Sequence, residues 1–341
     1  MQNSNLILGV GIRGTGQVAL QHIMAINNNP NAQVVAVCGR NLEKVQALIK
    51  NFNLKAKSYI NYEDMLSDVN VDIVSECMPN YLHADEAVLA FKAGKHLILE
   101  KPAGINEEQT QRIIEASNKS GKLSVCSFVL RWHPLVRNIK KLLSQDAFGK
   151  VYFVQADYWH GIQKQFSSYS WIKQKEFSGG AMITGGCHAV DISRYLNGEI
   201  TEVFAYKNKN RDDFDYDTTY NSTVKFANGS IGRISATLDG LAFPYQFNID
   251  LLGTDGAIRA NKFYSKKLIE NQEDWCSLPC ETPNSGKVNH HPFSDEINNL
   301  INGILYGEEI ICPVTEACKS MKAVYAIMES ADSGKPVTLR N

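Results

Sequence analysis

Short apolar runs alternate with longer amphipathic segments over the first third of the chain. The runs are apolar at almost every position, which is typical of parallel strands buried on both faces of a sheet, and segments with helical periodicity separate them. The pattern therefore predicts an α/β fold with a doubly wound parallel sheet. The predicted strands are Leu6–Val10, Val34–Cys38, Val71–Cys77, His96–Glu100 and Leu123–Phe128, and the predicted helices are Val18–Ile26, Asn41–Asn51, Ala84–Ala93 and Glu107–Ser120.

The pattern changes after about residue 131. Strand-like segments now alternate apolar and polar positions, as in Tyr245–Gly253, and Asn228-Gly229 marks a hairpin turn. This alternation predicts a C-terminal α+β domain with an open, mostly antiparallel sheet. We expect a first domain over residues 1–128 and a second over 129–341, with the closing helices free to pack back on the first. The other predicted elements are strands at Val151–His160, Glu202–Tyr206 and Asn221–Gly240, and helices at Phe293–Tyr306 and Thr315–Ser333.

Composition narrows the range of partners. The 341 residues are 44% hydrophobic and 21% charged, with a net charge of −1. Such near-neutrality argues against a nucleic-acid partner or an anionic membrane surface. The chain shows neither a long uninterrupted apolar run nor a signal-peptide pattern at its N-terminus, so no membrane association is expected. Several of the eight cysteines lie within apolar runs, which fits a reduced, cytoplasmic protein.

The stretch Gly9-Val10-Gly11-Ile12-Arg13-Gly14 matches the dinucleotide-binding pattern G-x-G-x-x-G. In such loops the first glycine permits a tight turn, the second lets the pyrophosphate approach the backbone, and the third allows helix and strand to pack closely. We therefore predict a Rossmann domain that binds NAD or NADP. The alternative is a glycine-rich turn that binds no ligand. The predicted cofactor contacts in this loop are Gly9, Gly11, Ile12, Arg13 and Gly14.

The end of the second strand bears on the choice of cofactor. An acidic residue there would bind the ribose 2′-hydroxyl of NAD, whereas a basic residue suits the 2′-phosphate of NADP. The sequence has Cys38-Gly39-Arg40-Asn41 at this place, with no carboxylate. Arg40 therefore favours NADP, unless it stacks on the adenine or faces water and leaves both cofactors acceptable.

Lys101 follows a buried strand, at the sheet edge where doubly wound folds bind ligands. A lysine beside a nicotinamide could donate a proton to a substrate oxygen. The alternative is an ion pair between Lys101 and Glu100 at the end of the strand.

Four motifs occur in the order and spacing of the Gfo/Idh/MocA oxidoreductase family, and the chain resembles that family over nearly its whole length. They are the glycine-rich loop, "MPNYLH" (Met78–His83), "EKP" (Glu100–Pro102) and "GGAMITGGCHAVD" (Gly179–Asp191). The resemblance implies a Rossmann domain followed by an open-sheet domain, assembled as a homodimer or homotetramer through that sheet. It implies that Lys101 is catalytic and binds substrate, that His188 is catalytic, that Asp191 contacts substrate, and that the Lys101–Pro102 bond is cis. The positions that it implies line the cofactor are Pro79, Asn80, His83, Glu100, Lys101 and Pro102.

His188 has the chemistry that such a reaction needs. Oxidation of a secondary alcohol removes a hydroxyl proton as hydride leaves carbon, and an imidazole suits that exchange. Lys101 would stabilise the developing negative charge on the same oxygen. The glycines between residues 179 and 186 would let the backbone lie against nicotinamide and sugar. The alternative is a core histidine that caps a helix.

One position departs from the family pattern, and the substrate contacts are less defined. Many relatives carry an aspartate four residues before the histidine, where this chain has Thr184. Threonine can hydrogen-bond an imidazole or a sugar hydroxyl but cannot stabilise imidazolium with a charge, so Asp191 could take over as partner. Trp159 and Trp171 suit the C–H faces of sugar rings, with core packing as the alternative. Arg131 would bind an acidic substituent or form a structural ion pair.

The leading hypothesis is an NAD(P)-dependent dehydrogenase or reductase that acts on a secondary hydroxyl of a sugar, glycoside or cyclitol. A glycoside-cleaving enzyme with transient oxidation by tightly bound NAD and a non-catalytic dinucleotide sensor are the alternatives. No metal is expected, because the spacing of Cys276, Cys280, His290 and His291 is unlike zinc-ribbon patterns. His291 is instead expected near the rim of the active site.

Overall fold

The computed structural model describes residues 6–239, 245–283 and 291–339. The chain divides into two compact units. The first unit comprises Met1–Phe128 and Phe293–Cys318, and the second comprises Val129–Pro292 and Lys319–Asn341. Gly240 and His290, named above, lie outside the described residues. Within the described part, no helix combines the length and the apolar character needed to cross a bilayer.

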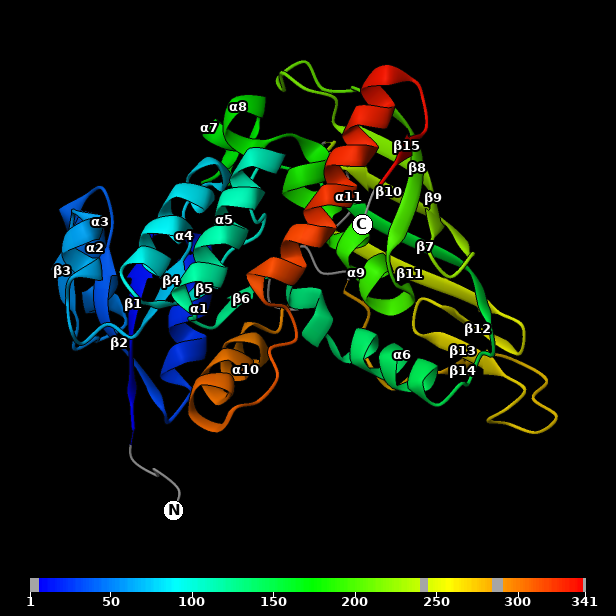
Figure 1. Ribbon diagram of the computed structural model, residues 1–341, viewed down its shortest axis with the longest axis horizontal. Coiled ribbons are helices and arrows are strands. Elements are labelled where there is room, and N and C mark those ends of the chain that lie inside the picture. Colours follow the sequence, from blue (N-terminus) through cyan, green and yellow to red (C-terminus); the bar gives the residue numbers. More distant parts are fainter. Residues whose placement is uncertain (1–5, 240–244, 284–290, 340–341) are drawn as a thin grey trace. The chain divides into compact units, whose positions relative to one another are not determined.

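The first unit is built on a six-stranded parallel sheet in the order β3-β2-β1-β4-β5-β6 (Figure 1). This order confirms the predicted doubly wound fold, whose direction of winding reverses between β1 and β4. The strands are β1 (Leu8–Arg13), β2 (Ala32–Cys38), β3 (Lys57–Tyr59), β4 (Ile73–Glu76), β5 (His96–Leu99) and β6 (Ser124–Cys126). The helices are α1 (Gln17–Asn27), α2 (Leu42–Asn51), α3 (Tyr62–Leu66), α4 (His83–Lys92), α5 (Glu107–Ser120) and α10 (Phe293–Tyr306), with a short 3₁₀ turn at Asn80–Leu82.

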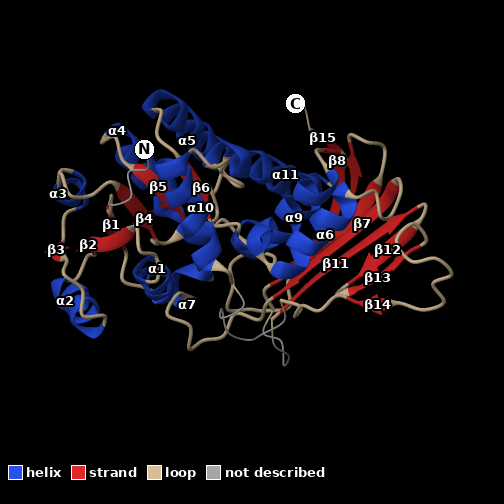
Figure 2. Cartoon of the chain, turned by 90° about the horizontal axis from the view of Figure 1, so that it is seen from below, coloured by secondary structure: helices blue, strands red, loops and turns tan. Residues whose placement is uncertain are grey.

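Helices cover both faces of this sheet. Helices α4 and α5 pack against each other on one face, and α1 and α10 pack against each other on the opposite face (Figure 2). Helix α10 comes from late in the chain but belongs to the first unit, where it also contacts β6. The following segment continues this attachment, because the backbone N–H of Cys126 donates to the carbonyl of Cys312 at 2.8 Å.

The second unit contains a nine-stranded sheet in the order β14-β13-β12-β11-β7-β10-β9-β8-β15. Among the described strand pairs of this sheet, only β7–β10 is parallel, so the predicted mostly antiparallel sheet is confirmed. Helices α6 and α9 lie on one face of it (Figure 2). The strands are β7 (Val151–Trp159), β8 (Ile200–Asn208), β9 (Thr219–Phe226), β10 (Ile231–Thr237), β11 (Gln246–Gly253), β12 (Gly256–Arg259), β13 (Lys262–Ser265), β14 (Cys276–Ser277) and β15 (Val337–Thr338). The helices are α6 (Pro134–Ser144), α7 (Tyr169–Ile172), α8 (Lys175–Ser178) and α9 (Cys187–Asn197), with a 3₁₀ turn at Val129–Trp132 and a π-helical turn at Met182–Gly186. Helix α11 (Val314–Ser333) belongs to the first unit up to Cys318 and to the second from Lys319.

The core of the first unit contains an acidic side chain on α10. Glu296 is fully buried, and its Oε1 accepts a hydrogen bond from the hydroxyl of Ser127 at 2.7 Å. Its Oε2 has no hydrogen-bond partner among the described residues. Burial, reinforced by the nearby charge of Glu100, raises the pKa of Glu296 well above its ordinary value. Burial therefore favours the neutral form of the Glu296 carboxyl group.

We expect Glu296→Gln to become more stable than the parent protein as the pH rises. A carboxyl group with a raised pKa in the folded state favours folding fully only below its unfolded pKa, and this contribution is lost as the pH rises towards the folded value. Glutamine has the shape of the neutral acid and does not titrate. Urea unfolding at about pH 5 and about pH 8 should show an advantage for the variant that grows by up to about 1.4 kcal/mol per pH unit. The exposed Glu309→Gln control should show no such trend, and a constant difference for Glu296→Gln would contradict the buried neutral acid.

Candidate functional site

The first strand is longer than the sequence pattern predicts, and this moves the glycine-rich turn. Strand β1 extends to Arg13, and Gly9 and Gly11 lie inside it, paired with β2 and β4. A Cβ on Gly9 would lie 1.8 Å from the carbonyl oxygen of Asn70, so this glycine serves close packing within the unit. The assignment of the cofactor loop to Gly9, Gly11 and Ile12 is therefore wrong; Ile12 is a fully buried strand residue.

The turn from β1 into α1 is formed by Gly14-Thr15-Gly16 instead. Gly14 has φ = +114°, and a Cβ there would lie 2.7 Å from the carbonyl oxygen of Cys77. Gly16 is the N-cap of α1, and a Cβ built on it would meet nothing within 4 Å. With Ala19, which is fully buried, these residues form G-x-G-x-x-A, an accepted variant of the dinucleotide pattern.

The N-terminus of α1 is left open for an anion. Helices α2, α3 and α5 begin at asparagine side chains that accept backbone N–H groups, namely Asn41, Asn61 and Asn106. Helix α1 has no such side-chain cap and no acidic residue in its first turn. Its free N–H groups and its dipole therefore suit a phosphate group, which is how a pyrophosphate is held in this fold.

Arg13 has a structural partner. Its guanidinium donates to both carboxylate oxygens of Glu86, at 2.8 and 2.6 Å, and lies over the ring of Tyr62. Only 8% of Arg13 is exposed. Because Nε and Nη2 face Glu86 and Nη1 donates to Sγ of Cys38, the prediction that Arg13 binds the cofactor is not supported. Arg40, by contrast, is exposed directly after β2, at the sheet edge where the ribose is expected.

Lys101 lies at the same sheet edge, directly after β5. It is half-buried, and the Lys101–Pro102 peptide bond is cis, as expected. The preceding Glu100 is buried, and its Oε1 lies 3.0 Å from Nε2 of His22. Burial opposes ionisation of Glu100, but the hydrogen bond and charge of His22, followed by the charge of Lys101, lower its pKa below the ordinary value. Glu100 is thus a structural anion that interacts with His22 on α1 and with the positive charge of Lys101.

The residues after β4 form the neighbouring loop. Pro79 is half-buried and precedes the 3₁₀ turn that begins at the buried Asn80. His83 was expected to line the cofactor, but its ring is 1% exposed and both of its nitrogens face backbone carbonyls. Nδ1 lies 2.8 Å from the oxygen of Pro102, and Nε2 lies 2.8 Å from that of Met78. Its polar atoms are used within the protein, so direct cofactor binding by the imidazole is not supported.

In the second unit, the glycines before His188 pack against protein. A Cβ on Gly185 would lie 2.5 Å from Cε1 of Tyr158, and one on Gly186 would lie 2.6 Å from Sδ of Met182. They let the π-helical turn lie directly on β7 and β10. The expectation that these glycines bring backbone towards a ligand is thus replaced by one of close packing around His188. Turns of π-helix are frequent at functional sites.

His188 begins the helix as predicted and lies within a group of aromatic rings. Its ring stacks on Tyr158, with centroids 5.4 Å apart and an interplanar angle of 18°. The ring of His291 is also nearly parallel to that of His188, at 6.3 Å and 19°. Tyr245 meets the edges of both Tyr158 and His291. Burial raises the pKa of Tyr158 and Tyr245, so both phenols stay neutral. The rings fix the plane of the His188 imidazole.

Arg131 and Asp191 bind each other. Nε and Nη2 of Arg131 donate to the two oxygens of Asp191 at 2.8 and 2.7 Å, and the hydroxyl of Ser320 donates to the same carboxylate at 2.6 Å. Arg131 is 2% exposed and Asp191 is fully buried. This arrangement favours the structural ion pair over substrate binding by either side chain. Thr184 is 6% exposed, and its hydroxyl donates to the carbonyl of Ser178 at 3.1 Å.

Trp159 lies on the wrong face of the sheet for its predicted role. Alternate residues of a strand point to opposite faces, and Tyr158, its neighbour in β7, stacks on His188. Trp159 instead donates from Nε1 to the hydroxyl of Ser235 at 3.0 Å, on the face that also carries Asp157. Its prediction as a substrate contact beside His188 is therefore not supported. Trp171 lies half-buried in α7, and its role stays a prediction.

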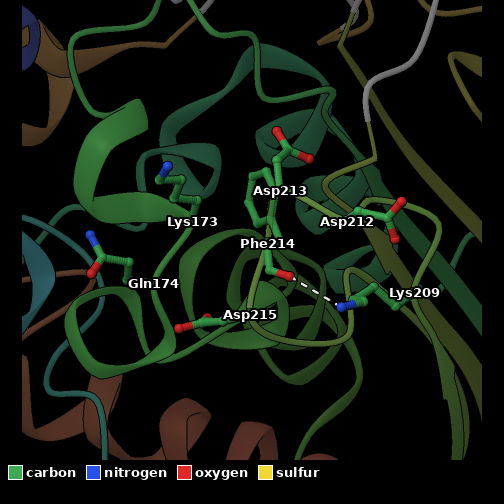
Figure 3. A pocket seen from close by; sticks show the side chains of 7 residues that line it. All are labelled: Lys173, Gln174, Lys209, Asp212, Asp213, Phe214 and Asp215. Carbon is green, nitrogen blue, oxygen red and sulfur yellow. Dashed lines mark hydrogen bonds between the residues drawn. The ribbon is translucent and has the colours of Figure 1, made fainter.

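A surface hollow of about 540 Å³ lies elsewhere in the second unit, beside α7 and α8 (Figure 3). Lys209 Nζ donates to the carbonyl of Phe214 there at 3.3 Å. Its lining mixes acidic and basic groups, and none of the predicted site residues contributes to it. The described residues also contain no group of His, Cys, Asp and Glu arranged to hold a metal. The lining residues are Lys173, Gln174, Lys209, Asp212, Asp213, Phe214 and Asp215.

Sequence reasoning missed several residues that organise the site. Gly16 and Ala19 were signalled by the second, overlapping glycine pattern, which was hidden because alanine takes the third place. His22, the partner of Glu100, carried no local signal, and His83 was named from its motif but not as the partner of the Pro102 carbonyl, because each contact joins positions far apart in the chain.

Comparison with known proteins gives matches in both units. Residues 8–128 match the model of an oxidoreductase family with an NAD-binding Rossmann fold, and residues 140–339 match that family's C-terminal α/β domain. The chain is 29% identical to trans-1,2-dihydrobenzene-1,2-diol dehydrogenase of Xenopus laevis over 87% of this chain and 89% of that protein. It is 23% identical to D-xylose 1-dehydrogenase (NADP(+)) 2 of Haloferax volcanii, over 96% and 99%.

Solved structures share the fold over the whole chain. Levoglucosan dehydrogenase in complex with NADH and L-sorbose superimposes with a TM-score of 0.90 at 22% identity, covering 99% of this chain and all of that one. The WlbA dehydrogenase of Bordetella pertussis, in complex with NADH and UDP-GlcNAcA, gives 0.87 at 23% identity and covers 100% and 99%.

The corrected position of the glycine turn is testable with two alanine substitutions. Gly16→Ala should leave the free energy of unfolding unchanged, because its Cβ meets nothing, yet weaken the binding of reduced nicotinamide cofactor about tenfold or more by crowding the helix N-terminus. Gly9→Ala should instead lower stability by about 1–3 kcal/mol or more through overpacking. Urea unfolding and cofactor fluorescence titration measure the two effects. The opposite result, with Gly9→Ala stable but unable to bind, would restore the original loop assignment.

Proposed function

The chain belongs to the Gfo/Idh/MocA oxidoreductase family, and from this premise we propose that it is an NAD(P)-dependent dehydrogenase acting on a secondary hydroxyl of a sugar, cyclitol or related ring diol. The observation that carries the proposal is the sheet edge of the first unit. There an uncapped helix N-terminus after β1 and a half-buried lysine after β5 flank the point at which the winding reverses.

The residues of the first unit fit a dinucleotide. Gly14 and Gly16 supply a turn without side chains, and α1 offers free N–H groups to a pyrophosphate. Pro79 and Asn80 would line the path towards Lys101, with Arg40 at the adenosine end. The bound nicotinamide would accept or supply the hydride.

Lys101 and His188 would act on the substrate oxygen. The ammonium of Lys101 would bind the hydroxyl and stabilise negative charge as it develops, while the imidazole of His188 would take the hydroxyl proton. The stacked rings around His188 support this role, because they hold the imidazole in one plane. Trp171 and Thr184 remain proposed substrate contacts.

A neutral ring alcohol is the substrate class that we propose. The names of relatives refer to a dihydrobenzene diol and to D-xylose, and one related structure holds L-sorbose. Within the second unit the guanidinium of Arg131 is committed to Asp191. This pairing speaks against recognition of an acidic substituent by Arg131.

NADP is the cofactor that we favour, and we propose assembly as a homodimer or homotetramer through the large sheet. Arg40 supports NADP, as does the relative from Haloferax volcanii, although the related structures described above hold NADH. The sheet face opposite α9 supports assembly, because it carries the polar group of Asp157, Arg233 and Ser235 together with Trp159.

Loss of the two proposed proton-transfer groups should stop turnover without unfolding the protein. We expect Lys101→Ala and His188→Asn each to lower kcat by about 10²–10⁴-fold. Cofactor binding should persist, because neither residue belongs to the phosphate turn. The assay follows reduced nicotinamide absorbance over a panel of sugars, cyclitols and ring diols, with circular dichroism as the control for folding. Full activity of either variant on a substrate that the parent oxidises would refute its role.

The cofactor preference can be tested separately at Arg40. Arg40→Ser should raise the Kd for NADP about tenfold or more by removing a charge-assisted contact to the 2′-phosphate. Its Kd for NAD should change less than about twofold. Lys50→Ser, at the exposed far end of α2, is the matched control. If the binding of both cofactors were weakened equally, Arg40 would stack on the adenine, and the proposed preference for NADP would be wrong.

A further inference from the structure

Lys101 stands between two residues that are each held by a buried histidine. The carboxylate of Glu100, before it, accepts from His22 on α1. The carbonyl of Pro102, after it, accepts from His83 on α4. Both histidines are 1% exposed or less. The backbone of Lys101 is thus anchored on both sides.

The two histidines differ in the protons that their contacts require. His22 faces a carboxylate at Nε2 and the hydroxyl of Ser75 at Nδ1, 2.8 Å away. A hydroxyl can donate or accept, so a neutral imidazole satisfies both contacts. His83 faces carbonyl oxygens at both nitrogens, and a carbonyl can only accept. Both hydrogen bonds exist only when the ring of His83 carries two N–H groups, which makes it a cation.

The surroundings supply the counter-charge that a buried cation needs. Oε2 of Glu76 lies 3.5 Å from Nε2 of His83, and the Glu76 side chain is fully buried. Burial raises the pKa of Glu76 to about 7, and a positive charge on His83 opposes this rise, so the cation and the carboxylate favour each other. The other oxygen of Glu76 accepts the N–H of Met78 at 2.9 Å. Glu100 adds negative charge in the same region, and the ammonium of Lys101 adds positive charge. Glu86, on the same helix as His83, is neutralised by Arg13.

The carbonyls that His83 binds belong to different loops. Met78 follows β4, and Pro102 follows Lys101 after β5. The oxygen of Pro102 also accepts the N–H of Gly104 at 2.9 Å, which closes the turn beyond Lys101. One imidazole therefore connects the loop expected to line the cofactor with the loop that carries Lys101.

We propose that His83 is a positioning residue that acts as a doubly protonated clamp between these two loops and thereby fixes Lys101 at the carboxyl edge of the sheet. Its effect on turnover rests on the proposed function, whereas the clamp itself rests only on the hydrogen bonds and on the charge of Glu76. His83 contacts neither substrate nor reacting atoms in this proposal.

Two measurements test the clamp without any assay of activity. Nitrogen NMR of the protein should show both ring nitrogens of His83 protonated at neutral pH. The amide of a glutamine at position 83 cannot hold both carbonyl oxygens as the imidazole does. In His83→Gln, hydrogen exchange in the segment from Ala103 to Gly104 should therefore accelerate about tenfold or more, because the turn opens more often. The control is His96→Gln, in the same sheet, where the ring accepts from Leu123 N–H. A neutral His83 ring, or unchanged exchange in this segment, would overturn the clamp.

Kinetics then test positioning. His83→Gln should lower kcat about tenfold to 10²-fold, because small misplacement of a catalytic group has effects of this size. Its KM for the oxidised cofactor should change less than about threefold, and His96→Gln should keep kcat. Unchanged kcat in His83→Gln would refute positioning. If the parent protein oxidises no alcohol at all, the proposed function fails, while NMR and hydrogen exchange still decide on the clamp.

Discussion

The parallel hydrogen-bond ladder of the first sheet continues one residue beyond each strand, and the site depends on this extension. The N–H of Gly14 donates to Cys38, that of Cys77 to Arg13, and that of Glu100 to Glu76, at 2.8, 2.8 and 3.1 Å. The first residue of each loop is therefore held in register with its neighbour. Loops that start in register bring the phosphate turn, the Met78 loop and Lys101 to one edge of one sheet. In such sheets ligands bind at this edge, at the point where the strand order reverses.

Burial of charge explains why several predicted ligand-binding residues proved structural. A charged group removed from water needs a partner of opposite charge and hydrogen bonds for its remaining polar atoms. Arg13 meets Glu86, Arg131 meets Asp191, and Glu100 meets His22. In each case the charge that seemed available for a ligand is satisfied within its own unit. The exposed Arg40 and the half-buried Lys101 retain access to solvent at the sheet edge.

Much of the fold could be predicted because its signals are local. Helices α5 and α10 begin and end where periodicity places them, at Glu107–Ser120 and Phe293–Tyr306. The glycine turn could not be placed by pattern alone, since two overlapping patterns share Gly14, and the extent of β1 and the packing of Gly9 against Asn70 distinguish them. Trp159 failed for a similar reason: a shift of one residue along a strand reverses the face.

The contacts that hold the residues on either side of Lys101 could not be predicted from the sequence. The contacts of His83 and His22 join segments up to 78 positions apart, and only the folded chain defines them. The replacement of an aspartate by Thr184 could be read from the sequence, but its consequence could not. The structure supplies a physical account, since the ring of His188 is nearly parallel to those of Tyr158 and His291.

Stacked rings constrain an imidazole differently from a carboxylate. A carboxylate fixes one nitrogen and favours the protonated ring, whereas aromatic faces fix the plane and leave the protonation state to other neighbours. A histidine held in this way keeps its orientation without an added negative charge that would retain its proton. For the proposed proton acceptor, such an environment sets the orientation of the ring without placing a second buried charge beside it. The aromatic setting of His188 is therefore compatible with proton exchange even though threonine replaces the usual aspartate.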